Sequence, residues 1–384
     1  MQRETQVKVL RRFLEHRAAR TTDMAERAMV NPASAYTDPA RTAVEVERLF
    51  RGQVLFSGLS GDLPDTGSYA TVEVGGVPVL LVRGEDGVVR AFLNACRHRG
   101  ARVVEGRGRA GRTFSCPYHA WCYDIGGRLM GQPLATEAFA DFDSGELGLI
   151  PLPSQERFGL VFVRAGGTEP VDVDATLAGL GPELGDYGFE EYRFFAERTR
   201  SFAMNWKLGV DTFLEAYHIF SLHKATIGPD FLSTPSMAEG FGPHGRVMIF
   251  RRSAGDLPPD DEDAWDLPAH AGIVYRLFPD VVFNHTKTGH LEVFRFTPEV
   301  TDPGRCRATA TFYTPGEVDS EQARAFWDRN VDFSLEVIFS EDFPTQERTQ
   351  ANLATGLLPA VRYGRNEPGL IHYHRSLDAA LDPS

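Results

Sequence analysis

Apolar residues recur at helical spacing near the start of the chain. Val7, Leu10 and Leu14 would lie on one face of a helix. A second helix is expected from Asp38 to Phe50. We therefore predict that residues 1–50 form a helical N-terminal segment.

The pattern then changes to short runs of apolar residues that are separated by glycine. Residues 69–74 and 77–82 flank Gly75-Gly76, which is the signal of a two-residue hairpin. Glycine and proline cluster again at residues 166–170, where the composition changes. We predict a small all-β domain over residues 51–168.

The remaining part of the chain, residues 169–384, mixes longer strands with helices. Helices are expected over 206–222, from a cap at Asp319 or Ser320 to 340, and from Pro344 to 355; strands are expected over 273–283, 290–297 and 308–314. The acidic stretch 237–269 is expected to be rich in loops. The chain as a whole is therefore predicted to be an α+β protein.

Composition and charge narrow the function. The chain is 42% hydrophobic and 24% charged, and its net charge of −13 argues against nucleic-acid binding. No apolar run approaches the roughly 18 residues of a membrane span, and the charged N-terminus does not look like a signal peptide. Four cysteines are too few for a disulfide scaffold in a chain of 384 residues. We expect a cytoplasmic protein without a nucleic-acid or membrane partner.

Two short segments carry residues of the types that bind metals. One reads ACRHRGARV and contains Cys96 and His98; the other reads SCPYHAW and contains Cys116 and His119. Two thiolates and two imidazoles could bind zinc or a [2Fe–2S] cluster. Ordinary packing is the alternative for either segment alone. Two such pairs at predicted loops of one small β domain favour a metal site.

The order of these residues along the chain favours iron over zinc. Zinc fingers of the Cys2His2 type pair Cys with Cys and His with His, whereas here each segment supplies one residue of each type. That alternation fits a Rieske centre, in which one iron takes both cysteines and the other takes both histidines. Cys122 lies close to this motif, but residues 99–115 contain no cysteine that could pair with it. We expect Cys122 to be a small packed residue and not a ligand.

A second group of polar residues lies in NWKLGVDTFLEAYHIFSLHK, residues 205–224. Asp211, Glu215 and His218 follow the spacing i, i+4 and i+7, so they would share one face of a regular helix. His218 and His223 are five residues apart, an offset of about 140° on a helix. Both could bind one metal only if the helix ends or widens before His223. A structural role for the two histidines is the alternative.

A carboxylate ligand would have to come from another part of the chain. Asp342 continues the apolar face that Val331 and Ile338 begin, because the three residues follow i, i+7 and i+11. Asp342 could instead cap the helical stretch that opens at Pro344. The neighbouring Glu341 is the alternative ligand.

The motifs CRHRG and CPYHAWCYD, followed by Gly126-Gly127, resemble the Rieske domain of the Rieske non-heme iron ring-hydroxylating oxygenases. The resemblance extends from about residue 40 to 355. It implies an antiparallel β Rieske domain over 51–168 and a helix-grip catalytic domain over 169–384, in which a curved antiparallel sheet lies over a long helix. It also implies that one cluster iron is held by Cys96 and Cys116 and the other by His98 and His119.

The resemblance gives roles to the second group as well. It implies that a mononuclear Fe(II) is bound by His218, His223 and Asp342, the two-histidine, one-carboxylate triad. Glu215 stands where the family has its bridging acid, often Asp, which links this iron to a cluster histidine of a neighbouring subunit, here His119. Asp211 stands where many members have Asn, and we expect it to tune the iron electrostatically or to act as a hydrogen-bond partner.

The implied function is that of the alpha subunit, the terminal oxygenase, in a homotrimer. Electrons would come from an NAD(P)H-dependent reductase, with or without a ferredoxin, and O2 would be used to hydroxylate or dihydroxylate a small aromatic or apolar substrate. Glu at position 215 also occurs in relatives that oxidise trimethylammonium compounds, so oxidative N- or O-demethylation or C–N cleavage is the alternative. Phe283, His285 and Phe294 lie on predicted strands that could line a pocket.

Two functions of other classes compete with the oxygenase. A non-catalytic Rieske electron carrier would hold two irons per chain, whereas an oxygenase would hold about three. A zinc-stabilised binding protein would be colourless. The second set of ligand residues argues against both.

Overall fold

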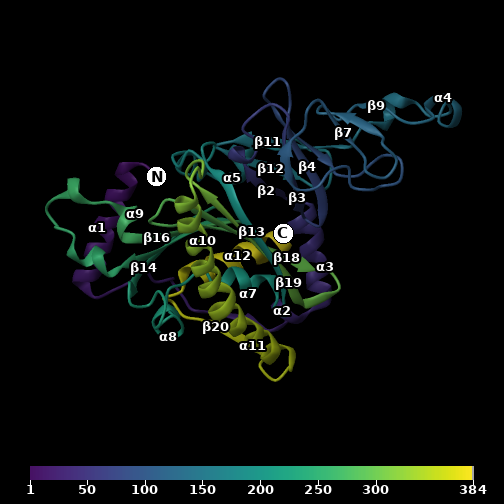
Figure 1. The fold of residues 1–384 in the computed structure, drawn as a ribbon. Helices are drawn as coiled ribbons and strands as arrows, with labels where there is room; N and C mark the ends of the chain where they lie inside the picture. Colours follow the sequence, from purple (N-terminus) through teal and green to yellow (C-terminus); the bar gives the residue numbers. More distant parts are fainter. Residues whose placement is uncertain (383–384) are drawn as a thin grey trace. The chain divides into compact units, whose positions relative to one another are not determined.

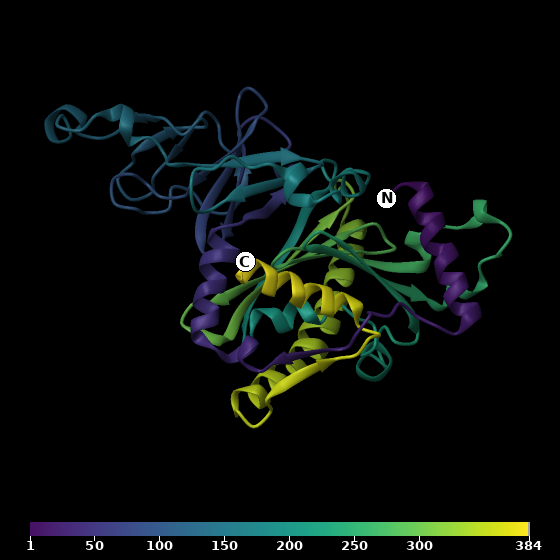
Figure 2. The same ribbon diagram turned by 180° about the vertical axis from the view of Figure 1, so that it is seen from behind.

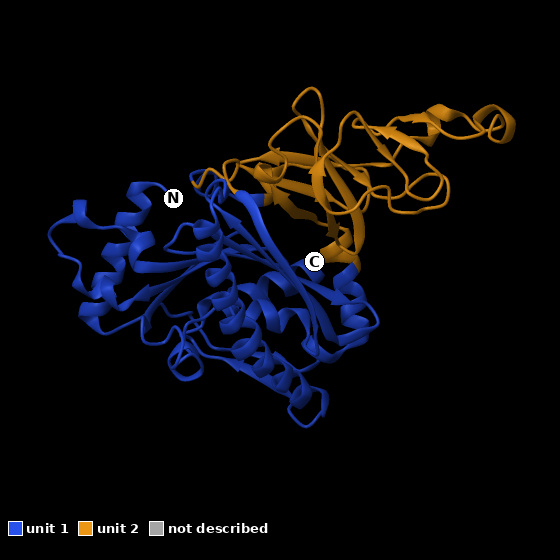
Figure 3. Ribbon diagram, viewed as in Figure 1, with its two compact units in different colours: residues 1–46, 177–186, 193–384 blue, residues 47–176, 187–192 orange. Residues whose placement is uncertain are grey.

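The computed structural model describes residues 1–382, which divide into two compact units (Figure 3). Unit 1 comprises residues 1–46, 177–186 and 193–384, and unit 2 comprises residues 47–176 and 187–192. Unit 2 is thus inserted into the chain of unit 1, and the N-terminal residues belong to unit 1. The domain boundaries predicted at residues 50 and 168 stay predictions.

Unit 1 is built on a seven-stranded antiparallel sheet with the order β13-β19-β18-β17-β16-β15-β14. Its strands are β13 (Arg193–Phe202), β14 (Phe231–Phe241), β15 (His244–Arg251), β16 (Ala271–Leu277), β17 (Val281–His285), β18 (Leu291–Glu299) and β19 (Asp302–Thr314). The single strand predicted over 273–283 is wrong, because the chain turns at Phe278-Pro279 and forms a hairpin of two strands. Proline has no N–H to donate to a sheet, which favours a break at this point.

Two helices cover one face of this sheet (Figures 1 and 2). Helix α12 (Pro368–Leu381) packs against β14 and β15, and α7 (Trp206–Asp211) packs against β18 and β19. The rings of Trp206 and Tyr373 join the two helices in an edge-to-face contact at 6.5 Å between centroids. The predicted α+β, helix-grip architecture is confirmed, with α12 as the long helix that the sheet grips.

The prediction of one continuous helix over 206–222 is wrong, because the helix is interrupted in the middle of this range. The chain forms α7, then turns, and then makes a single helical turn, α8 (Ile219–Leu222). The Glu215 carboxylate accepts hydrogen bonds from the backbone N–H groups of Tyr217 and His218. Such local side-chain bonds compete with a continuous helix, so the interruption has its cause in Glu215 itself.

The prediction that 237–269 is rich in loops is wrong for its first part, which β14 and β15 occupy as far as residue 251, whereas residues 252–269 form turns and short helical pieces. Pro235 and Gly240 lie within β14, and both residues are unusual inside strands. Most of β15 is buried on both faces, so its sequence lacks the alternation that marks a half-buried strand.

The helices predicted near the end of the chain form with one unexpected feature. Helix α10 (Glu321–Leu335) begins at a Ser320 cap that accepts the Ala323 N–H, and α11 (Phe343–Ala354) has Pro344 in its first turn. A π-helical segment, η6 (Glu336–Asp342), joins them. Short π-helical segments within α-helices are frequent at functional sites.

The N-terminal residues of unit 1 contain the expected helices and a strand between them. The elements are α1 (Arg3–Ala19), β1 (Met29–Pro32), α2 (Ser34–Thr37) and α3 (Pro39–Glu45), and β1 pairs with β20 (Ala360–Tyr363). The Asp38 side chain caps α3 by accepting the Ala40 N–H at 2.8 Å. Shorter helical pieces of unit 1 are α6 (Gly181–Gly185), α9 (Leu267–His270), η4 (Arg252–Asp256) and η5 (Glu262–Ala264), whereas the π-helical η1 (Val46–Arg51) and α5 (Val173–Leu177) lie where the chain passes between the two units.

Unit 2 consists of three antiparallel sheets, with the orders β10-β5-β4-β3-β6, β11-β12-β2 and β7-β8-β9. The strands are β2 (Val54–Leu59), β3 (Ser68–Val74), β4 (Val77–Arg83), β5 (Val89–Leu93), β6 (Arg107–Arg109), β7 (Thr113–Ser115), β8 (Cys122–Asp124), β9 (Leu129–Gly131), β10 (Pro151–Leu152), β11 (Ser154–Arg157) and β12 (Leu160–Arg164), with short helical turns η2 (Ser60–Asp62), α4 (Ala135–Ala138) and η3 (Ser144–Leu147). The predicted hairpin is confirmed: Gly75 and Gly76 have φ of 58° and 80° between β3 and β4, as a type I′ turn requires.

Among residues 1–382, no helix has both the length and the apolar character that crossing a bilayer requires.

Candidate metal sites

Two loops of unit 2 place Cys96 and Cys116 in the same backbone arrangement. One loop follows β5 and the other joins β7 to β8. In each loop the cysteine N–H donates to the carbonyl five residues later, and the cysteine carbonyl accepts the N–H four residues later. That fourth residue is Gly100 or Ala120, with φ of 77° and 56°, a conformation that favours glycine. The two loops therefore form similar tight turns around their cysteines.

The four predicted cluster ligands come together at these turns. Cys96 and Cys116 are both buried in the same hydrophobic cluster of unit 2. The rings of His98 and His119 lie 4.5 Å apart between centroids. The structure thus brings thiol to thiol and imidazole to imidazole, which is the grouping that a Rieske centre needs for its two irons.

The surroundings of these residues fit a bound cluster. The His98 ring stacks on Trp121 at 5.1 Å, and its Nδ1 atom is buried without a hydrogen-bond partner among residues 1–382. Burial raises the pKa of the Cys96 thiol, so its thiolate needs a cation beside it. The Tyr123 hydroxyl lies 3.3 Å from the Cys96 sulfur and accepts the Arg97 N–H at 3.0 Å. Hydrogen bonds to sulfur are one means of tuning a cluster potential.

Cys122 lies beside this group on β8, where its backbone pairs with Ser115 of β7. Its side chain is half-buried, and its thiol is free. Cys306, on β19, is also free, and burial raises the pKa of its thiol to about 12. A thiol with so high a pKa is unreactive near neutral pH.

In unit 1, His218 and His223 stand at the two ends of helix α8. His218 is the N-cap and His223 the C-cap of this single turn, and their ring centroids lie 5.1 Å apart. The helix therefore ends at His223, which is one of the two conditions under which residues five apart can approach one metal.

Asp342, the last residue of the π-helical segment η6, completes this group. Its Oδ1 atom lies 3.1 Å from His223 Nε2 and 3.5 Å from His218 Nε2. One potential ligand atom from each of the three residues lies within 4.8 Å of the others. Burial raises the pKa of the Asp342 carboxyl, against the opposing effect of the histidines. A buried cluster of this composition has the donor set of a mononuclear Fe(II) site.

Two further carboxylates hold the other ring nitrogens of these histidines. Glu215 pairs with His218 Nδ1, and Glu341 pairs with His223 Nδ1 at 2.6 Å. An Nδ1–H that donates to a carboxylate leaves the Nε2 lone pair directed at Asp342, which is the tautomer that a metal ligand requires. Burial alone would lower the pKa of both histidines, but the carboxylates raise it.

From the sequence, Glu341 was the alternative metal ligand. In the structure it instead holds the ring of a candidate ligand, His223. Its side chain accepts the Thr226 hydroxyl at 2.8 Å in addition to pairing with His223. The sequence favoured Asp342 as the ligand, because Asp342 continues the apolar face of the preceding helix, and left Glu341 as the alternative. It did not show that Glu341 would hold the His223 ring.

Asp211 lies in a different environment from Glu215. Its carboxylate accepts the Tyr36 hydroxyl at 2.9 Å and lies 2.8 Å from His374 Nε2. It borders a second cavity, of about 180 Å³, which Glu215, His218 and Asp342 also line. The hydrogen-bonding role expected of Asp211 is thus directed at Tyr36 and His374, partners that the sequence did not reveal.

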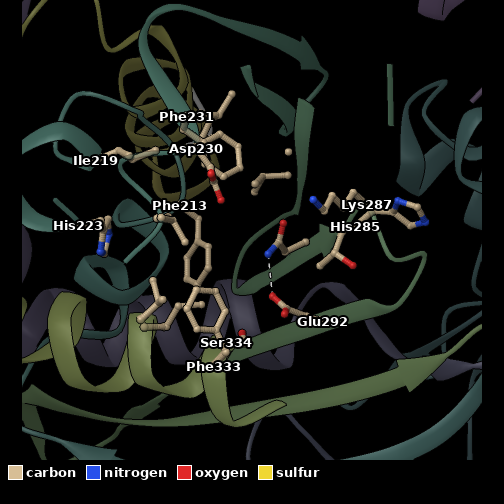
Figure 4. Close-up of a pocket in the computed structure, with 18 of the residues that line it drawn as sticks. Phe213, Ile219, His223, Asp230, Phe231, His285, Lys287, Glu292, Phe333 and Ser334 are labelled. Atoms are coloured by element: carbon tan, nitrogen blue, oxygen red, sulfur yellow. Dashed lines mark hydrogen bonds between the residues drawn. The ribbon is translucent and has the colours of Figure 1, made fainter. Parts of the chain in front are cut away.

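The main cavity of unit 1, about 300 Å³, is lined by all three candidate ligands, of which Figure 4 labels His223. In Figure 4, Phe213 lies between His223 on one side and His285 on the other. His285 lines the cavity as expected, whereas Phe283 and Phe294 are fully buried in the core.

Replacing Glu341 with alanine should weaken metal binding at this site by about 10- to 100-fold, because the His223 ring would lose the partner that orients it. Anaerobic titration of the metal-depleted protein with Fe(II) or Co(II) measures the change. Glu336→Ala, which removes an exposed acid of the same segment η6, is the matched control. Unchanged affinity in the Glu341 variant would show that its hydrogen bond has no part in the site.

Comparisons with known proteins match two parts of the chain to family models. Residues 189–382 match the family model of the ring-hydroxylating alpha subunit, catalytic domain, and residues 54–147 match that of the Rieske [2Fe–2S] domain. The glycine betaine monooxygenase oxygenase subunit of Chromohalobacter salexigens is 35% identical over 195 residues, 50% of this chain and 42% of that protein. Biphenyl 2,3-dioxygenase subunit alpha of Rhodococcus jostii is 36% identical over 142 residues, 37% of this chain and 31% of that protein.

The fold also resembles that of a quaternary ammonium Rieske monooxygenase, with a TM-score of 0.78 at 22% identity over 92% of this chain and 96% of that one. The matches span about half the length, or less, of the glycine betaine monooxygenase and biphenyl dioxygenase relatives. Because the catalytic-domain match alone covers half of the chain, the chain belongs to the ring-hydroxylating oxygenase alpha subunits, which combine a Rieske [2Fe–2S] domain with a mononuclear-iron catalytic domain.

Proposed function

We propose that this chain is a terminal oxygenase component that takes electrons from a separate NAD(P)H-dependent reductase and inserts oxygen from O2 into a small organic substrate. One observation carries the proposal. The same chain holds a thiol–imidazole quartet in unit 2 and a His–His–Asp group that opens onto a cavity in unit 1. An electron carrier would need only the first of these.

The proposed ligands of the two groups are those predicted from the sequence. The cluster irons would be held by Cys96 and Cys116 and by His98 and His119, and the mononuclear iron by His218, His223 and Asp342. When bound, the cluster supplies single electrons and the mononuclear iron supplies the activation of O2. Glu215 and Glu341 hold the histidine rings in the ligating tautomer.

The quaternary arrangement follows from the family. We propose a homotrimer in the cytoplasm, in which His119 of one subunit passes electrons to the site beside Glu215 of the next. The domains would be the segments predicted from the sequence, with 51–168 receiving electrons and 169–384 binding the substrate. A ring of subunits gives each cluster a catalytic site in a neighbouring chain.

For the reaction, oxidative attack on a quaternary ammonium compound has the stronger support. A relative at 35% identity is named for glycine betaine, and the acid at position 215 is Glu. Hydroxylation of an aromatic ring is the second candidate, because a relative at 36% identity is named for biphenyl and aromatic side chains of Phe213, Phe231 and Phe333 line the cavity.

Iron content and isotope incorporation test the proposal. The purified chain should hold about three irons, two of them in a cluster. After chemical reduction, a single exposure to 18O2 should convert at least one candidate substrate to an oxidised product. A hydroxylated aromatic product should carry one 18O atom after monooxygenation and two after dioxygenation. N-demethylation should instead give the demethylated amine and one equivalent of formaldehyde, because the oxygen from O2 leaves with the formaldehyde and exchanges there with water. A chain with two irons, or the absence of any oxidised product, would contradict the proposed function.

A further inference from the structure

Arg251, the last residue of β15, lines the main cavity and has an unusual environment. It is the register partner of Phe231 on β14, and its guanidinium carbon lies 4.5 Å from the centroid of the Phe231 ring. Figure 4 places Phe231 on the cavity wall across from Phe333 and Ser334. The guanidinium therefore lies over an aromatic side chain in the lining of the cavity that the candidate iron ligands share.

No carboxylate pairs with this guanidinium in the described part of the chain. Within residues 1–382, no acidic oxygen comes within 4.0 Å of an Arg251 nitrogen, and its buried Nε atom has no hydrogen-bond partner. The exposed Asp230 attracts it from a greater distance. Burial lowers the pKa of Arg251, with Asp230 opposing the effect.

Arg246, on the same strand, shows how this protein neutralises a buried guanidinium that has a structural role. It forms ion pairs with Glu183 and Glu239. Glu292, a buried acid that also lines the cavity, forms no ion pair with Arg251. Its two oxygens are already paired with Asn284 at 2.7 Å and His290 at 3.0 Å.

An unpaired charge in a partly apolar cavity costs free energy. The planar guanidinium fork matches a carboxylate with two parallel hydrogen bonds. We propose that Arg251 binds a carboxylate of the substrate, so that the substrates of this enzyme are small organic acids. The inference rests on the proposed function, because it assigns the substrate class of that same cavity.

Two further features of the cavity agree with an anionic substrate. The Ser334 hydroxyl, on the wall across from Phe231, is buried and has no hydrogen-bond partner among the described residues, so it can donate to another polar group of the substrate. The guanidinium already covers one face of Phe231, so that face cannot hold a trimethylammonium group. A zwitterionic substrate would therefore point its carboxylate, not its cation, toward β14 and β15.

Binding of matched acids and amides tests the inference without turnover. The full-length, iron-loaded protein is titrated anaerobically with glycine betaine, γ-butyrobetaine and benzoate, and with the primary amide of each. We expect at least one acid to bind wild type at least about 10-fold more tightly than its amide. Arg251→Gln should weaken binding of that acid about 10- to 100-fold and leave the amide unchanged. Arg251→Lys should restore part of the loss.

Arg252→Gln is the matched control, because this adjacent arginine is exposed and its Nε donates to the Pro229 carbonyl at 2.7 Å. The inference is wrong if no acid binds better than its amide, or if Arg251→Gln weakens acid and amide equally. The acid–amide comparison on wild type needs no variant to fold. The absence of any oxidised product despite tight acid binding would overturn the proposed function alone; oxidised product without acid selectivity would overturn this inference alone.

Discussion

Replacing Asp342 with alanine is expected to abolish substrate oxidation and to leave the visible spectrum of the Rieske cluster unchanged. The carboxylate is the one anionic member of the group formed with His218 and His223, and it is buried. Two neutral imidazoles alone hold Fe(II) weakly. Iron content should therefore fall from about three to about two per chain, because the cluster ligands lie in a different unit.

The measurement combines iron analysis, the visible spectrum and product formation with a surrogate reductase. Product must be measured directly, since O2 consumption alone can be uncoupled from oxidation. Asp332→Ala, which removes an exposed acid from α10, is the matched control. Retained turnover in the Asp342 variant would exclude Asp342 as a ligand. Loss of the cluster spectrum would show that the substitution acts through folding and not at the iron.

The two candidate sites differ in how far the sequence could predict them. The cluster quartet needs two tight turns, and each turn is contained in six consecutive residues. The motif itself indicates such a turn, for example through Gly100, which adopts a left-handed conformation in one of them. The same is true of the Gly75-Gly76 hairpin. The hairpin is confirmed, and the four cluster ligands stay a prediction, although the structure brings these residues together.

The second site depends on contacts that are distant along the chain. Asp342 lies more than 100 residues after His223, and only packing decides that it, and not Glu341, faces the two Nε2 atoms. The interruption of the predicted helix comes from a side-chain bond of Glu215 to the backbone ahead of it. Helical periodicity reports apolar faces and is insensitive to such bonds.

The absence of a partner is harder still to predict. Arg246 and Arg251 are the same type of residue on the same strand. Arg246 is paired with two acids, whereas Arg251 is paired with none among the described residues. That difference arises from the complete fold around each residue. The substrate class inferred for the cavity therefore could not have been read from the sequence.

The largest effect on stability is expected from Glu45→Ala. Glu45 on α3 and Lys207 on α7 form an ion pair in which both side chains are 0% exposed, with Nζ 2.6 Å and 2.7 Å from the two carboxylate oxygens. Burial lowers the pKa of Lys207, and Glu45 opposes that effect. Removing the carboxylate leaves a buried ammonium without a partner, which should cost about 3–5 kcal/mol of unfolding free energy.

The companion variants separate the charge from the packing. Arg41 and the Trp206 ring N–H also bond to Glu45, so Lys207→Met leaves the carboxylate partly satisfied and should cost less than Glu45→Ala. The double variant Glu45→Gln/Lys207→Met should recover much of the loss, because it leaves no buried charge unpaired. Thermal unfolding followed by tryptophan fluorescence gives the order of stabilities.

Glu47→Ala is the surface control, since Glu47 is 63% exposed in its pair with Arg51, and it should cost less than about 1 kcal/mol. A Glu45 variant no less stable than this control, or a double variant as unstable as Glu45→Ala, would show that the buried charge is not the cause. Lys207 and Asp211 share the helix α7, and the chain continues from it to Glu215 and His218. Loss of the ion pair should therefore also reduce iron loading at the mononuclear site, while the cluster spectrum of unit 2 is unchanged.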